Sequence, residues 1–337
     1  MLKTLSLTFF RNFENRVFEF QGGLNIIIGK NGSGKTNLLE SIAYLSFPRS
    51  FRGVLDSDLV MWGEDFFRIE GLYQDDVEHM IKCFYSSNDR VKKIHVNEKK
   101  VDRLSKLFFL FPTLVSTDRD QDIVDGPPEK RRSLFDKLIS LVDMHYYRTL
   151  IDYRKAIENK NVLLKEKRLE EVKYWNREIE KLSTYIITKR TEFLKEITMT
   201  FDLKSGVLLN GKKADIRYFK KIDIEEGILD SKLEEELEFG FSIYGPHRDR
   251  FEFYIEGRPA KAAASEAEKR MMLLSLYFAF MERFERDKDK KPVLILDEPL
   301  SILDDERIEA LLGQLESQVF ITTPRWGLQY EANLIEL

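Results

Sequence analysis

The pattern of hydrophobic and polar positions predicts strands at the beginning of the chain. Polar and apolar residues alternate over 2–9 and 16–20, which is typical of half-buried strands. The run LNIII at 24–28 is continuously apolar, as expected of a central strand in a parallel sheet. The next segment, TNLLESIAYLSF at 36–47, has apolar residues at helical spacing, and residues 66–101 alternate again between turns. We therefore expect a strand, a loop and a helix in succession, followed by a β-rich region.

A different pattern begins after the Gly-Pro-Pro at 126–128. Neither glycine nor proline occurs between 129 and 201, charges are dense, and apolar residues recur at helical intervals, so we expect an antiparallel helical arm. A break near 167–170 would divide this arm into two helices of about 25 residues, each about 37 Å long at 1.5 Å per residue. The dipeptide Asn210-Gly211 then predicts a short hairpin.

The last third of the chain returns to alternating helices and strands. A helix is predicted from Ser265 to about Glu285. Two buried strands follow, PVLIL at 292–296 and QVFITT at 318–323, with a helix over 304–316 between them. Together with the N-terminal strand, loop and helix, this order predicts an α/β fold.

Composition narrows the class of protein. The chain has 337 residues, of which 43% are hydrophobic, so we expect a globular protein of two lobes. A single cysteine, Cys83, excludes a disulfide scaffold and a cysteine-rich zinc module. The longest apolar stretch, at 271–281, is too short for a membrane span, which needs about 20 residues. A net charge of -4 argues neither for nor against binding to nucleic acid.

The strongest motif is GKNGSGKT, which satisfies the phosphate-loop pattern G-x-x-x-x-G-K-[ST] between a predicted strand and a predicted helix. Its glycines let successive backbone N–H groups face a phosphate, and the helix N-terminus adds a positive dipole end. Lys35 would bind the β- and γ-phosphates of ATP, and the Thr36 hydroxyl would ligate Mg²⁺. An ordinary glycine-rich turn is the alternative. The predicted nucleotide-binding residues are Gly29, Lys30, Asn31, Gly32, Ser33, Gly34, Lys35 and Thr36.

A second motif, PVLILDEP, is an apolar strand that ends in two acids. Ligands of open α/β sheets bind at the carboxyl ends of the strands. Asp297 could therefore hold Mg²⁺, and Glu298 could act as the base for an attacking water. Two solvated acids at the end of a strand are the alternative interpretation. With Lys35, these two acids are the predicted catalytic residues.

These two motifs resemble those of ABC-type, SMC/Rad50-like P-loop ATPase heads. In such heads an S-x-L-D loop follows the acidic strand, and Ser301-Ile302-Leu303-Asp304 matches it, so the resemblance implies that Asp304 lies near the nucleotide. A signature serine precedes the strand and contacts the nucleotide of the other subunit in trans. Ser265 matches this serine, but Ser265 with Glu268 also forms a capping box, which would make it a plain helix cap.

The sequence departs from the ABC pattern at two positions. Ala267 stands where the signature usually has glycine, and Thr323 stands where many heads have a switch histidine. Both departures concern hydrolysis more than nucleotide binding, so we expect a weak ATPase.

Longer segments resemble the RecF family of bacterial DNA replication and repair proteins. They include FRNFENRVFEFQGGLNIIIGKNGSGKTNLL, DGPPEKRRSLFDKLISLVDMHYYRTL, YGPHRDRFEF and QVFITT. The resemblance implies a cytoplasmic, nucleoid-associated ATPase whose ATP-dependent homodimer binds DNA at single-stranded gaps or junctions. It also implies cooperation with RecR and RecO in loading RecA. Residues matching Arg11 and Asn12 approach the nucleotide in related heads, although a turn with a solvated arginine is equally compatible with the sequence.

The resemblance also implies a domain organisation. Residues 1–115 and 240–337 would form the ATPase lobe, and 116–239 an inserted helical lobe that contains the arm and the short hairpin. The subunit of a membrane transporter is an alternative, disfavoured by this insertion and by the missing signature glycine. An SMC-like chromosome-tethering or nuclease-associated ATPase is another, disfavoured by the short arm.

Clusters of basic residues are candidates for contacts with DNA phosphates. Each cluster alone is equally explained as a solvated face, whereas several on one surface would add their phosphate contacts. The clusters are Lys92-Lys93, Lys99-Lys100, Lys130-Arg131-Arg132, Lys212-Lys213, Lys220-Lys221 and Arg248 with Arg250.

Overall fold

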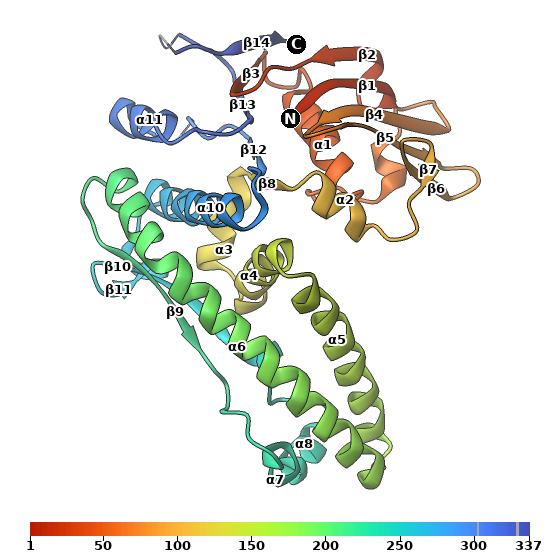
Figure 1. The fold of residues 1–337 in the computed structure, drawn as a ribbon, viewed down its shortest axis with the longest axis vertical. Helices are drawn as coiled ribbons and strands as arrows, with labels where there is room; N and C mark the ends of the chain where they lie inside the picture. The colour runs from red at the N-terminus through yellow and green to blue at the C-terminus, as the bar shows by residue number, and fades with distance from the viewer. Residues whose placement is uncertain (302, 328–329) are drawn as a thin grey trace. The chain divides into compact units, whose positions relative to one another are not determined.

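The computed structural model describes residues 1–301, 303–327 and 330–337. The chain forms two compact units, which are described separately below (Figure 1). The sheet unit comprises residues 1–119 and 284–337, and the helical unit comprises residues 120–283. The first boundary lies close to the one expected at 115/116, but the second lies at 283/284 instead of 239/240.

The sheet unit contains one parallel and one antiparallel sheet. The parallel sheet has the order β14-β3-β13-β12-β8, with β3 (Leu24–Ile28), β8 (Thr113–Ser116), β12 (Val293–Leu296), β13 (Val319–Thr323) and β14 (Asn333–Glu336). The antiparallel sheet has the order β2-β1-β4-β5-β6-β7, with β1 (Leu2–Phe10), β2 (Phe13–Glu19), β4 (Phe66–Gln74), β5 (Glu78–Ser86), β6 (Val91–Val96) and β7 (Lys99–Lys100). The predicted buried strands are confirmed, because β3, β12 and β13 occupy the centre of the parallel sheet.

One hydrophobic core joins both sheets of this unit to helix α1 (Lys35–Ser46). Leu38, Leu39 and Ile42 of α1 are completely buried in it, since they recur at helical spacing on one face. Apolar residues of both sheets surround this face, among them Leu5, Phe67, Ile27, Ile295 and Phe320. The unit also contains α2 (Ser105–Leu110), α11 (Asp305–Leu312) and a 3₁₀ turn at Asp56–Leu59.

The helical unit is built around the predicted arm, whose second helix is longer than expected. The arm consists of α5 (Met144–Lys165) and α6 (Leu169–Leu208), which lie side by side (Figure 1). The predicted break is confirmed at 166–168. The predicted length of about 25 residues is wrong for α6, which has 40 residues and is about 60 Å long at 1.5 Å per residue. Its buried face continues through Phe201, Ser205 and Leu208, so the helix does not end at 201.

The hairpin predicted at Asn210-Gly211 is absent from this part of the described chain. Both residues have positive φ angles, 53° and 82°, and they follow the C-terminus of α6. The next strand, β9 (Ala214–Phe219), pairs with the distant β10 (Arg250–Ile255), and β11 (Arg258–Pro259) completes the sheet. Because this pairing and the contacts of β10 with α4 (Pro128–Val142) tie residues after 240 to the helical unit, the second boundary falls later than predicted.

Five short or connecting helices complete the helical unit. They are α3 (Gln121–Asp125), α7 (Ile228–Ser231), α8 (Leu233–Phe239), α9 (Ala260–Ala263) and α10 (Glu266–Lys288), and the division between the two units falls within α10. Throughout residues 1–301, 303–327 and 330–337, every helix is too short or too polar to cross a membrane.

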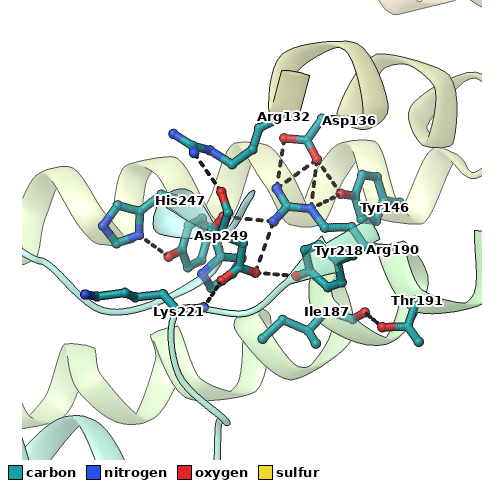
Figure 2. A network of polar contacts seen from close by, with 12 residues as sticks. Arg132, Asp136, Tyr146, Ile187, Arg190, Thr191, Tyr218, Lys221, His247 and Asp249 are labelled. Carbon is teal, nitrogen blue, oxygen red and sulfur yellow. Dashed lines mark hydrogen bonds and ion pairs between the residues drawn. The ribbon is translucent and has the colours of Figure 1, made fainter. Parts of the chain in front are cut away.

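A buried ion-pair network holds the helices of this unit to its sheet (Figure 2). Arg190 of α6 is 2% exposed and forms ion pairs with Asp136 of α4 at 2.9 Å and with Asp249 at 3.4 Å. Tyr146 of α5 donates to Asp136 at 2.6 Å, and Tyr218 of β9 donates to Asp249. A buried charge is tolerated only when it is paired and its hydrogen bonds are satisfied. The guanidinium of Arg190 therefore holds α4, α5, α6 and the beginning of β10 in one arrangement.

Replacement of Arg190 with methionine should destabilise the helical unit strongly. It would leave the buried carboxylates of Asp136 and Asp249 without their cation, which costs about 3 to 5 kcal/mol of unfolding free energy. Urea unfolding followed by helical circular dichroism measures this change. Lys189→Met is the matched control, because Lys189 is more exposed and pairs with the surface residue Glu192. Equal unfolding free energies of the two variants would contradict the stabilising role of the network.

Candidate functional site

The phosphate loop connects β3 to α1 as predicted, with backbone geometry that requires glycine. Gly32 and Gly34 have φ angles of 84° and 108°, a region that residues with a Cβ rarely adopt. Gly34 is also the N-cap of α1 and provides no capping side chain, so backbone N–H groups of the first turn remain available for an anion. A Cβ on Gly29 would lie 2.4 Å from the Ser33 hydroxyl oxygen, which leaves no room for a larger residue there.

The side chains of the loop divide into exposed and buried ones. Lys30 and Asn31 are exposed at the tip of the loop. Lys35 is 5% exposed, and its ammonium donates to the carbonyl oxygens of Gly29 at 3.0 Å and of Lys30 at 3.3 Å. These contacts curl the loop around the lysine, with the ammonium inside the curl.

The acidic strand end lies against the beginning of α1. The Thr36 hydroxyl donates to Asp297 Oδ1 at 3.0 Å, although the two residues are 261 positions apart. Parallel pairing of β12 with β13 and of β13 with β3 places the carboxyl ends of these strands at the same edge. Hydroxyl and carboxylate oxygens are the ligands that Mg²⁺ prefers. The oxygen donors of Thr36 and Asp297 thus fit the predicted Mg²⁺, which they would hold beside the phosphate loop.

Glu298 lies beside the phosphate-loop lysine in a strained backbone conformation. Its Oε1 is 3.5 Å from Lys35 Nζ, and its side chain is 39% exposed. Its φ angle of 46° lies in the left-handed region, which costs free energy for a non-glycine residue. Such strain is common where a side chain must be aimed at a reacting group.

A residue that the sequence analysis did not identify, Thr322, holds both acids. Its hydroxyl donates to Asp297 Oδ1 at 2.7 Å and accepts the backbone N–H of Glu298 at 2.8 Å. The side chain is completely buried at the end of β13. The signal in the sequence is the pair of threonines that ends QVFITT, of which only Thr323 corresponds to a position of the ABC pattern. Thr323 instead donates to the carbonyl oxygen of Arg325 at 2.8 Å.

Asn12 lies on the phosphate loop, whereas Arg11 is held beside it. The Asn12 amide donates to the carbonyl oxygen of Ser33 at 3.0 Å and accepts from Asn37 at 2.8 Å. A Cβ on Gly34 would lie 2.6 Å from that amide nitrogen. The contact of Asn12 with a nucleotide stays a prediction, supported by this proximity.

The side chain of Arg11 is held by protein contacts and is not freely solvated. Its guanidinium forms an ion pair with Glu40 at 3.0 Å and donates to the carbonyl oxygen of Asp58 at 3.0 Å. Glu40 is completely buried within α1, and Ser50 donates to its other carboxylate oxygen. The sequence analysis missed Glu40 because a single acid within an apolar helix carries no motif. Contact between Arg11 and a nucleotide is likewise untested.

Ser265 belongs to the helical unit and forms the capping box that its spacing indicates. Its N–H donates to Glu268 Oε2 at 2.7 Å, and its hydroxyl accepts the N–H of Glu268 at 3.3 Å. The ion pair with Lys212, with the backbone bond from Ser265, lowers the pKa of Glu268 to about 2. Ser265 remains exposed at the beginning of α10, so capping and contact with a second subunit are compatible.

Asp304 caps a different helix. It accepts the backbone N–H of Arg307 at 3.0 Å at the start of α11, and its other oxygen pairs with the Arg307 guanidinium at 2.5 Å. Of the matched S-x-L-D loop, Ile302 lies outside the described residues. The predicted contact of Asp304 with a nucleotide stays a prediction.

One of the basic clusters, Lys130-Arg131-Arg132, contributes to the fold. Arg131 and Arg132 are 8% exposed, and they donate to carbonyl oxygens of Phe251 and Asp249 at 2.6 and 2.7 Å. They are therefore unsuited as free phosphate contacts. The lysine of this cluster, Lys130, pairs with an aspartate at the surface. A sequence cannot distinguish such buried arginines from exposed ones, because their partners are backbone oxygens far along the chain.

Comparison with known proteins identifies the family. The model of the RecF/RecN/SMC N terminal domain matches residues 1–335. The DNA replication and repair protein RecF of Caldanaerobacter subterraneus subsp. tengcongensis is 34% identical over 95% of this chain and 93% of its own length. The protein of the same name from Moorella thermoacetica is 32% identical, over 97% and 90% of the two chains.

Solved structures agree with the sequence comparison. The structure of the recombination mediator protein RecF with ATP in the RecFOR pathway matches with a TM-score of 0.84 and 32% identity, over 98% of this chain and 93% of that one. An SMC head bound to a winged-helix domain of ScpA matches with a TM-score of 0.62 at 17% identity, over 96% and 89%, which shows a shared fold. The chain therefore has the α/β fold of an ABC-type, SMC-like ATPase head with an inserted helical unit, and it belongs to the RecF family.

Proposed function

We propose that this protein is an ATP-dependent DNA-binding protein of recombinational repair and replication restart. The observation that carries the proposal is the convergence of Lys35, Thr36, Asp297 and Glu298 at one edge of the parallel sheet. Its relatives are DNA replication and repair proteins by name, and one was solved with ATP. In this proposal the protein acts in the cytoplasm, at the nucleoid.

The geometry supports slow hydrolysis of ATP. The loop N–H groups and Lys35 would bind the phosphates, and Thr36 and Asp297 would hold Mg²⁺, which neutralises charge on the β- and γ-phosphates when bound. Glu298 would accept a proton from the attacking water. Ala267 and Thr323 replace the usual glycine and histidine, which supports a weak ATPase. In this proposal DNA stimulates the hydrolysis.

The proposed cycle couples nucleotide binding to dimerisation on DNA. ATP would join two subunits when Ser265 of one subunit meets the γ-phosphate bound by the other, and hydrolysis would release them. The ATP-bound dimer would recognise single-stranded gaps or junctions and, with RecR and RecO, aid the loading of RecA. A relative is described as a recombination mediator in the RecFOR pathway, which supports these partners.

Lys35→Ala should weaken ATP binding without unfolding the sheet unit. Loss of a charge-assisted hydrogen bond worth about 1.5 to 3 kcal/mol lowers affinity roughly 10- to 100-fold. Calorimetric titration with ATP and Mg²⁺ measures the affinity, and circular dichroism checks the fold. Lys93→Ala, at an exposed lysine of β6, is the control and should bind ATP normally. Normal affinity in a folded Lys35→Ala variant would refute the phosphate-loop assignment.

Glu298→Gln should bind ATP but hydrolyse it about 10² to 10⁴ times more slowly, because the water loses its general base. Asp297 still holds Mg²⁺ in this variant, so the ATP-bound dimer should accumulate. Sedimentation with ATP, Mg²⁺ and gapped DNA should show a dimer that persists on DNA longer than the wild type. Glu309→Gln, at an exposed acid of α11, should behave as the wild type. Hydrolysis at the wild-type rate would exclude Glu298 as the base.

Ser265→Arg should abolish ATP-induced dimerisation while each monomer still binds ATP. The arginine would obstruct the face that meets the second subunit, whereas the phosphate loop is unchanged. Dimerisation is measured by sedimentation and DNA-stimulated hydrolysis by phosphate release. A mixture with Lys35→Ala subunits should regain part of the activity, because one shared site in the heterodimer has both halves intact.

Two further variants separate this role from helix capping. Ser265→Asp keeps a good N-cap but places a negative charge toward the phosphate, so it should also block dimerisation. Ser231→Arg makes the same substitution at an exposed serine of α7 and should dimerise normally. If Ser265→Asp and Ser265→Arg both dimerise with ATP, Ser265 is a helix cap without a role in trans.

A further inference from the structure

The Thr322 hydroxyl connects the two acids of the candidate site through a single oxygen atom. A hydroxyl has one hydrogen to donate, and Thr322 donates it to Asp297 Oδ1 at 2.7 Å. The same oxygen accepts the backbone N–H of Glu298 at 2.8 Å. The side chain is completely buried, so water has no access with which to replace either contact. The proposed metal ligand and the proposed base are therefore positioned by one group.

The contact with Glu298 stabilises an otherwise unfavourable backbone conformation. The φ angle of Glu298 is 46°, and a residue in the left-handed region relaxes unless its surroundings hold it there. The hydrogen bond from its N–H to the Thr322 hydroxyl fixes this peptide to the neighbouring strand β13. The carboxylate of Glu298 is 39% exposed and receives less support from packing. Its direction thus depends strongly on its backbone.

The contact with Asp297 differs from that of Thr36. Both hydroxyls donate to the same Oδ1 atom, Thr36 at 3.0 Å and Thr322 at 2.7 Å. Thr36 is a proposed Mg²⁺ ligand, and its oxygen would then turn toward the metal. Thr322 lies on β13, outside the phosphate loop, so its hydrogen bond can persist through the whole cycle. It can keep the carboxylate in one orientation while the first bond is exchanged.

We propose that Thr322 is a positioning residue for ATP hydrolysis, which acts by holding Asp297 and the backbone of Glu298 in one arrangement. This inference rests on the proposed function of the site. It predicts a slower chemical step with little effect on ATP binding, because the Thr322 hydroxyl bonds to Asp297 and to the backbone of Glu298, and Lys35 and the loop N–H groups bind the phosphates in the proposed function. A purely structural role would instead lower stability and ATP affinity together.

The test compares isosteric and conservative variants of the full chain. Thr322→Val keeps the shape and removes both hydrogen bonds, so kcat should fall about 10²-fold, the loss expected when a reacting group is misplaced by about 1 Å. The KM for ATP and the affinity measured by titration should change less than about threefold by the same argument. Thr322→Ser restores the hydroxyl and should recover most of kcat. Thr113→Val makes the same change at a buried threonine of β8, where the strand begins, and should leave kcat unchanged.

A double variant identifies the group through which Thr322 acts. In Glu298→Gln the base is already absent, so adding Thr322→Val should reduce kcat by much less than it does in the wild type. Full additivity would overturn a role through Glu298. An unchanged kcat in a folded Thr322→Val variant, or an equal loss in Thr322→Ser, would overturn the proposal as a whole. If Glu298→Gln itself hydrolyses ATP normally, the proposed function of the site fails, which is a distinguishable result.

Discussion

The arrangement of the candidate site depends on one carboxylate oxygen. Asp297 Oδ1 accepts hydrogen bonds from Thr36, in the first turn of α1, and from Thr322, the penultimate residue of β13. Three chain segments that are far apart in sequence meet at this atom, because β3, β13 and β12 are parallel neighbours with matching carboxyl ends. A shift of one residue in either strand pairing would turn these side chains to the other face of the sheet. The hydrophobic core that fixes the strand register therefore also fixes the positions of the side chains in the candidate site.

The features that could be predicted from the sequence were short motifs and single helices or strands. The phosphate loop and the acidic strand end are short patterns, and β3, α1, β12 and β13 follow from hydrophobic runs of the expected lengths. Thr322 was missed because its partners depend on the pairing of strands, which no local pattern reveals. The prediction of a hairpin at Asn210-Gly211 was wrong for a related reason. The dipeptide does turn the chain, but β9 pairs with β10 instead of with a preceding strand.

The helical unit shows the same limit on a larger scale. The absence of glycine and proline correctly predicted two long helices, although α6 is longer than expected. The buried charges of the unit could not be recognised in the sequence. Arg190, Asp136 and Asp249 come from segments that look like solvated helix faces or turns, yet all three are buried together. Lys160 and Glu236 form a second completely buried ion pair between α5 and α8. Dense charge in the arm is thus partly structural, and net charge alone says little about contacts with DNA.

The ion pair between Lys35 and Glu298 relates the strain at the site to the proposed reaction. The two groups are 3.5 Å apart, and the same ammonium is the proposed ligand of the β- and γ-phosphates. A triphosphate carries more negative charge than one carboxylate, so it would draw Lys35 toward itself and weaken the pair with Glu298. The hydrogen bond from the Glu298 backbone to Thr322 involves neither charged group, so this exchange would free the carboxylate from its cation while the backbone contact stays in place.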